Sequence, residues 1–133
     1  MQNLPNEPQW LSAETVIDIN RTVVEITAEP HFVRERGLLE SALARPQNAF
    51  AYGEEDILAL AVRLLAGIAQ AHAFAQGNKR TCFVAMVQFL NINGYDLAID
   101  DTQRWADAVI ALVEHRTGEE DFARAVRPFV IER

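Results

Sequence analysis

The chain has 133 residues, of which 50% are hydrophobic and 23% are charged, a balance that is typical of a globular domain and too apolar for a disordered chain. Its net charge of −7 and pI near 4.9 argue against a nucleic-acid surface or an anionic membrane as partner, because both would need clustered Lys and Arg. The single cysteine, Cys82, excludes an internal disulfide and fits a reducing compartment. We expect one domain over residues 1–133.

The N-terminal stretch MQNLPNEPQW has neither the charged start nor the apolar run of a signal peptide. The most apolar region, from Ile57 to Ala75, is interrupted by Arg63, Gln70 and His72, so we interpret it as a buried helix and not as a membrane span. A cytoplasmic location is therefore expected.

Three helices are predicted in the first half of the chain. Ser12 can cap the first, which should end before Pro30. Its predicted inner face consists of Val16, Ile19, Val23 and Ile26. The second, over GLLESALA, should end near Pro46, because the residue before a proline avoids the helical conformation. The third, from about Asp56 to Ala71, is apolar on nearly every side, which predicts a central, buried helix.

Three more helices are predicted in the second half. The fourth runs from about Lys79 to Asn93 and ends at Asn93-Gly94. Asp101 can cap the fifth helix. The spacing of four apolar residues in this helix predicts that they face the core: Trp105, Ala108, Val109 and Leu112. The sixth, from about Glu119 to Val130, should turn Phe122 and Val126 inward.

No stretch has the sustained alternation of a long strand, although Tyr95 to Ile99 could pair briefly. The predicted fold class is all-α, a compact bundle of about six helices. The Asp100-Asp101 pair is better interpreted as a helix cap than as a metal site.

The stretch HAFAQGNKRT, from His72 to Thr81, joins the third and fourth predicted helices. Gly77 permits backbone conformations that other residues resist. Asn78, Lys79 and Arg80 then open the next helix, where free N–H groups and the helix dipole favour an anion. Cations in a first turn oppose that dipole, but they are explained if a phosphate binds there.

His72 directly precedes this loop, where it could exchange a proton beside the bound anion. A base, an anion cradle and a cationic clamp together indicate phosphoryl or nucleotidyl transfer to a hydroxyl. The alternative is purely structural, with His72 as a cap and Lys79-Arg80 as a solvated pair. The loop is not a Walker A motif, because Gly67 and Gly77 are too far apart and asparagine follows Gly77.

HAFAQGNKRT closely resembles the signature of the Doc (death-on-curing) toxins in the Fic/Doc superfamily. VRERGLLESALARPQ and FAYG are similar to the family's segments before the central helix, and FLNINGYDL is similar to the segment after the motif helix. The resemblance extends from Val33 through Asp121. It implies a small helical bundle of Fic/Doc type, with the motif loop between two central helices.

The resemblance also implies an activity, the use of ATP to modify a hydroxyl on a target protein. By position, His72 would be the general base and Phe74 the apolar anchor of the loop. Gly77 and Asn78 would form the anion cradle. Lys79 and Arg80 would hold phosphates. In the wider Fic group a glycine stands where this chain has Lys79 and AMP is transferred, whereas Doc-like members with lysine are thought to bind the nucleotide reversed and to transfer its terminal phosphate.

The same resemblance implies partners. The target would carry a Ser or Thr hydroxyl, and a translation factor is the first candidate. The built-in inhibitory pattern of the Fic group, Ser or Thr followed four residues later by Glu and then Gly or Asn, is absent from the sequence. Restraint would therefore come from a separate antitoxin protein.

Five residues depart from the family pattern: Gln76, Asn20, the pair Glu29-Pro30 and Glu35. Gln76 stands where the family usually has aspartate or asparagine, and a carboxylate there would help to hold Mg²⁺. The neutral and longer glutamine is a poorer ligand for a hard cation. Mg²⁺ would then arrive with the nucleotide. Two alternatives stay open: a Doc fold that has lost efficient catalysis and acts as a binding partner, and AMP transfer.

The remaining candidates are interpreted as structural. His31 and His115 lack metal-ligand spacing with His72 or with each other. Cys82 is expected to be a small buried residue.

Overall fold

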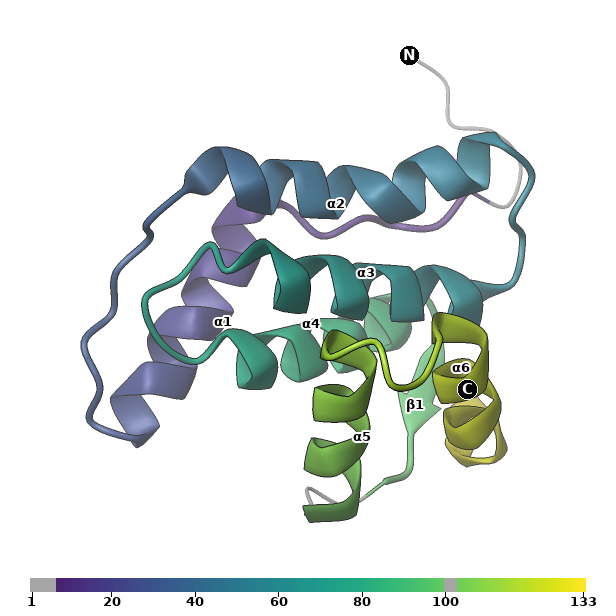
Figure 1. Cartoon of the computed structure of the whole chain (residues 1–133). Helices are drawn as coiled ribbons and strands as arrows, with labels where there is room; N and C mark the ends of the chain where they lie inside the picture. Colours follow the sequence, from purple (N-terminus) through teal and green to yellow (C-terminus); the bar gives the residue numbers. More distant parts are fainter. Residues whose placement is uncertain (1–6, 100–102) are drawn as a thin grey trace.

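Helix α3 (Ile57–Ala71) lies at the centre of the computed structural model, which describes residues 7–99 and 103–133. It packs against α2 on one side and α4 on the other (Figure 1). The side chain of Asp56 caps it by accepting a hydrogen bond from the Leu58 N–H at 3.2 Å. Ten of its fifteen residues are buried, which confirms the predicted central helix.

The described residues form six α-helices, a 3₁₀ turn (η1) and one two-stranded sheet, which confirms the predicted all-α class. The elements around α3 are α1 (Ala13–Ile26), α2 (Arg36–Ala51), α4 (Asn78–Ile92), β1 (Tyr95–Leu97), α5 (Gln103–Val113), α6 (Glu119–Val126), η1 (Arg127–Phe129) and β2 (Val130–Glu132). None of the helices in these described ranges combines the length and the hydropathy that a membrane span requires.

Helix α1 begins as predicted, because the Ser12 hydroxyl accepts a hydrogen bond from the Thr15 N–H. Its predicted inner face is correct except at Ile26, which is 71% exposed. Val24, buried like Val23, takes that place. The inner face shifts because the last turns of α1 pack under the loop between α3 and α4, where a Cβ added at Gly77 would lie within 3.3 Å of both valines.

Helix α2 does not end near Pro46, as predicted, but continues through it to Ala51. Proline lacks the N–H that would bond the carbonyl four residues earlier, here that of Ala42. A Cβ added at Gly67 of α3 would lie 3.2 Å from the Ala42 oxygen, so α3 packs closely against this part of α2. Pro46 itself is buried. Packing against α3 therefore outweighs the local tendency of proline to end the helix.

The C-terminal region differs from the predicted helix 119–130, because α6 ends at Val126. Pro128 cannot donate the backbone hydrogen bond of a continuing helix, and the chain tightens into η1. Val130 then pairs with Leu97 in an antiparallel register, so the predicted brief strand at Tyr95–Ile99 is confirmed over its first three residues. In α5 the four core-spaced residues are buried or half-buried. The predicted cap at Asp101 lies outside the described residues.

Candidate active site

The HAFAQGNKRT loop joins the C-terminus of α3 to the N-terminus of α4, beside α1 (Figure 1). Two left-handed residues bracket it. His72, the C-cap of α3, has φ 51° and ψ 39°, and Gly77, the N-cap of α4, has φ 76° and ψ 18°. A left-handed conformation is ordinary for glycine but uncommon for histidine, and such residues concentrate at functional sites.

The side chain of Asn78 closes the loop on itself. Its Oδ1 accepts a hydrogen bond from the Phe74 N–H at 3.1 Å, and its Nδ2 donates to the Phe74 carbonyl at 2.8 Å. The side-chain amide of Asn78 is thus used within the protein, which leaves the backbone N–H of this residue for the predicted anion cradle. The side chain of Asn78 shapes the loop in which that cradle is predicted.

The N-terminus of α4 has no side-chain cap. The first helical hydrogen bond runs from the Thr81 N–H to the Gly77 carbonyl at 2.9 Å. The N–H groups of Asn78, Lys79 and Arg80 precede it and have no acceptor within the helix. Three such groups at the positive end of a fifteen-residue helix form a site for an anion.

The first half of the loop is fixed by the connection between α1 and α2. Phe74 is fully buried and forms an antiparallel bridge with Val33. The Ala73 carbonyl accepts from the Arg34 N–H at 2.7 Å, and the Ala75 N–H donates to the Phe32 carbonyl at 3.0 Å. The backbone immediately before and after Phe74 is therefore hydrogen-bonded to the connection between α1 and α2.

The second half of the loop is hydrogen-bonded to Asn20, a fully buried residue of α1. Its Nδ2 donates to the Gln76 carbonyl at 2.8 Å and to the Thr81 hydroxyl at 3.0 Å, and its Oδ1 lies 2.9 Å from His31 Nδ1. From the sequence, Asn20 is only a departure from the family pattern, and His31 has no predicted role in the site. The signal available in the sequence was a lone amide on the apolar face of α1.

Gly77 is required by close contacts as well as by its φ angle. A Cβ at this position would lie 3.1 Å from Val24 Cγ1, 3.3 Å from Val23 Cγ1 and 3.3 Å from Asn20 Nδ2. All three neighbours are buried and so have little room to move. The loop can approach α1 this closely only with a glycine.

Four side chains of the loop are exposed: His72, Gln76, Lys79 and Arg80. Lys79 and Arg80 lie at a groove of about 550 Å³ between α4, β1 and α5, and its other lining residues include Phe83, Val87 and Trp105. His72 does not line this groove. The imidazole of His72 makes no hydrogen bond to any other residue of 7–99 or 103–133.

The described residues offer no group of three or more His, Cys, Asp or Glu side chains that could hold a metal ion. The loop itself has no carboxylate, and Gln76 presents only a neutral amide. Cys82, in the first turns of α4, is fully buried, and this burial raises the pKa of its thiol to about 12. At neutral pH it is a protonated thiol and not a nucleophile, in agreement with the expected structural role.

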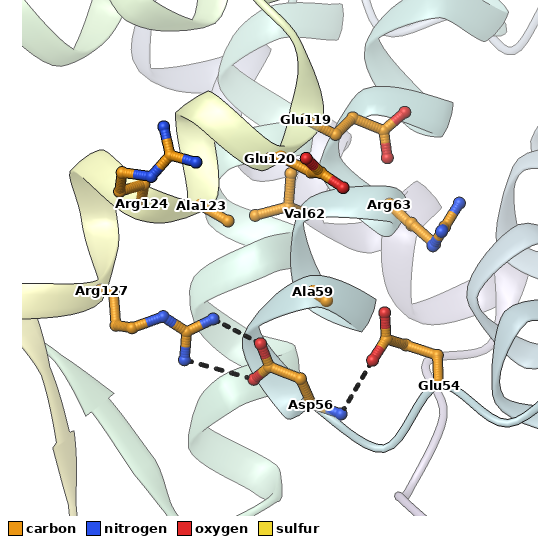
Figure 2. Close-up of a pocket in the computed structure, with 10 residues that line it drawn as sticks. All are labelled: Glu54, Asp56, Ala59, Val62, Arg63, Glu119, Glu120, Ala123, Arg124 and Arg127. Atoms are coloured by element: carbon orange, nitrogen blue, oxygen red, sulfur yellow. Dashed lines mark hydrogen bonds and ion pairs between the residues drawn. The ribbon is translucent and has the colours of Figure 1, made fainter.

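A second hollow, of about 370 Å³, lies at the opposite end of α3, against α6 (Figure 2). Its charges are largely paired within the protein. Arg127 of η1 bonds both carboxylate oxygens of Asp56, which raises the pKa of that guanidinium, and Glu54 accepts from the Asp56 N–H. Glu119 pairs with Arg45 at 2.9 Å. These ion pairs fasten α6 and η1 to the N-terminal end of α3 and to α2, and the hollow contains no residue of the loop.

Comparison with known proteins gives a family match and a similar protein. The sequence model of the Fic/DOC family matches residues 10–90, which include α1 to α4 almost completely. A protein named Toxin Doc, from Mycolicibacterium smegmatis, is 47% identical over 79 residues. The matched stretch covers 56% of this chain and 60% of the length of that protein. Both matches agree with the resemblance predicted from HAFAQGNKRT and its flanking segments, and the chain belongs to the Fic/DOC family.

Proposed function

We propose that this chain is a Doc-like toxin, which transfers the terminal phosphate of ATP to a Ser or Thr hydroxyl of a target protein and so arrests growth. The observation that carries the proposal is the arrangement of the loop. An exposed histidine in a left-handed conformation is followed within eight residues by an uncapped helix N-terminus and two exposed cations. Similarity to a protein named Toxin Doc supports the assignment to a toxin, which an antitoxin would restrain in the cytoplasm.

In the proposed reaction, a ring nitrogen of His72 accepts the proton of the target hydroxyl. The hydroxyl oxygen forms a bond to the γ-phosphorus of ATP, and the bond from that phosphorus to the oxygen bridging the β- and γ-phosphates breaks. ADP leaves with the electron pair of the broken bond. The N–H groups at the start of α4, with Lys79 and Arg80, stabilise the negative charge on the phosphates.

Mg²⁺ enters this proposal as part of the substrate, MgATP. The described residues around the loop provide no ligand set of their own for a metal ion. The side chains of this chain therefore bind and orient the nucleotide and move the proton, while charge neutralisation by metal is a property of the nucleotide complex.

The test is to incubate the purified protein in a cell lysate with ATP labelled on either the γ- or the α-phosphate. Label from the γ-phosphate on one protein band supports phosphate transfer, and we would examine translation factors first. Label from the α-phosphate would instead indicate AMP transfer. The second candidate, a catalytically weak binding protein, is motivated by the neutral Gln76 and predicts no label from either position and no growth defect on expression.

Replacing Lys79 or Arg80 with alanine is expected to weaken ATP binding without destabilising the fold. Both side chains are exposed, and a cation in a first turn opposes the helix dipole, so stability should be unchanged or raised by at most about 1 kcal/mol. Lys79 is the only lysine in the sequence. Labelling lysine with ¹⁵N therefore gives one backbone amide signal, at the N-terminus of α4, whose shift on titration with ATP measures the affinity of the wild type and of Arg80→Ala. Lys79→Ala contains no lysine, so its ATP affinity is measured by isothermal titration calorimetry, with the wild type titrated in the same way.

The matched control for these variants is Arg124→Ala, which removes an exposed cation from α6. It should leave ATP affinity at the wild-type value. If Lys79→Ala and Arg80→Ala unfolded at markedly lower temperature and yet bound ATP normally, the two cations would be structural.

Replacing Gln76 with aspartate is expected to raise phosphate transfer at low Mg²⁺. The new carboxylate would give a hard cation a charged oxygen ligand beside the phosphates. The gain should shrink at saturating Mg²⁺, where the metal carried by the nucleotide suffices. Initial rates across a Mg²⁺ titration measure the effect. Gln70→Asp, which adds the same charge at an exposed site of α3, is the control. Efficient transfer by the wild type at low Mg²⁺, with no improvement in Gln76→Asp, would show that glutamine serves this site well.

A further inference from the structure

Asn20 and His31 form a polar link beneath the loop that the reaction scheme does not use. Asn20 uses both hydrogens of its side-chain amide, because Nδ2 lies 2.8 Å from the Gln76 carbonyl and 3.0 Å from the Thr81 hydroxyl. The Gln76 oxygen can only accept, which fixes the orientation of the Asn20 amide. Oδ1 is left as an acceptor, so the Nδ1 of His31, at 2.9 Å, must carry the hydrogen between them.

The two groups that Asn20 bonds lie on either side of the N-terminus of α4. Gln76 directly precedes Gly77, and Thr81 is the first residue whose N–H is bonded within the helix. The hydrogen bonds that Asn78 and the Phe32–Glu35 connection make to the loop end on residues 73–75. Within the described residues, Asn20 is thus the side chain from another helix that holds the turn into α4.

His31 extends this link to the connection between α1 and α2. It is half-buried and lies just before the Phe32–Glu35 segment, whose backbone bonds the first half of the loop. The same short connection therefore fixes the loop twice, directly at residues 73–75 and through Asn20 at Gln76. A buried amide that bonds three partners is costly to disturb, because each loss leaves a polar group unpaired.

We propose that Asn20 and His31 are a positioning pair that sets the orientation of the anion-binding N–H groups of α4 relative to His72. This inference rests on the proposed function only in assigning phosphate transfer to the loop. Its physical content is that the His31–Asn20 hydrogen bond keeps the Gln76 carbonyl, and with it the turn at Gly77, in one orientation. Misplacement of reacting groups by about 1 Å can cost 10²-fold in rate.

Under this proposal, two replacements of His31 should have different effects on catalysis. Asparagine can place its Nδ2 close to where Nδ1 of histidine lies, and so can still donate to Asn20, whereas leucine cannot. We expect His31→Leu to lower kcat about tenfold with KM for ATP changed less than about twofold, because the phosphates still bind but are misoriented. His31→Asn should retain most of the wild-type kcat. His115→Leu, which replaces an exposed histidine after α5, should leave both constants unchanged.

A second measurement does not depend on catalysis. The single ¹⁵N-lysine amide reports the motion of Lys79 in the first turn of α4. Its order parameter should fall from about 0.85 towards about 0.6 in His31→Leu and remain high in His31→Asn. Thr81→Val, which removes the hydroxyl bonded by Asn20 and nearly keeps its shape, should lower the order parameter in the same direction.

Two results would overturn the proposal: an unchanged order parameter in both His31→Leu and Thr81→Val, or equal losses of kcat in His31→Leu and His31→Asn. If the wild type transferred no phosphate, the proposed function would fail. The order parameters alone would then decide whether the pair positions the loop. A fall in thermal stability with an unchanged order parameter and kcat would assign Asn20 and His31 to the core and not to the site.

Discussion

His72→Ala is expected to abolish phosphate transfer and growth inhibition while leaving the protein folded. General base catalysis contributes about 10²- to 10⁴-fold to a rate, and His72 provides the one imidazole of the loop. His72 is exposed, so removal of its side chain should cost little stability. Transfer of the γ-label, growth at equal expression and the thermal midpoint measure the three parts of this expectation.

His115→Ala provides a closely matched control. His115 is also exposed and also left-handed, with φ 60°, but it lies after α5 and outside the loop. The two substitutions therefore remove the same side chain from the same kind of backbone. Only His72→Ala should eliminate activity. Full growth inhibition by His72→Ala would refute the proposed mechanism.

The helices were predictable because their signals are local. Ser12 and Asp56 cap α1 and α3 through residues two or three positions away, and the apolar stripes are visible in the sequence. Pro46 shows where local reasoning fails. Its effect on α2 is decided by Gly67, 21 positions further along, which allows α3 to pack closely against the Ala42 carbonyl. No pattern around Pro46 contains that information.

The same distinction between local signals and distant contacts applies to the candidate site. The residue types of HAFAQGNKRT were sufficient to predict a base, an anion site and a cationic clamp, because each predicted role follows from chemistry close to one helix end. The hydrogen bonds that hold the loop in place were not predictable. Asn20 reaches partners 56 and 61 positions away, and its bond to His31 depends on how α1 turns into the next segment. Asn78 was predicted to contribute to the anion cradle, but the two bonds of its side chain to the Phe74 backbone had no signal in the sequence.

Gly77→Ala is expected to destabilise the protein by about 1–3 kcal/mol, since a residue with a Cβ is strained at φ 76°. The added methyl would also press on Val24 at 3.1 Å and on Asn20 at 3.3 Å. These neighbours are buried, so the loop must move away from α1 to relieve the contact. That movement displaces the N-terminus of α4, and ATP affinity and phosphate transfer should both fall. Denaturant unfolding and the ¹⁵N-lysine titration measure the two effects.

Gly94→Ala is the control that separates the effect of backbone strain from the effect of steric contact. Gly94 has φ 92°, but a Cβ there would meet nothing within 4 Å. It should therefore show the backbone strain of a left-handed alanine and no loss of ATP affinity. The excess destabilisation of Gly77→Ala over Gly94→Ala is then the energy of the close approach between the loop and α1. If the two variants lost the same stability and both bound ATP normally, the contact of Gly77 with Val24 and Asn20 would be unimportant. The anion site would then tolerate displacement of its own N-cap, contrary to a cradle built from oriented N–H groups.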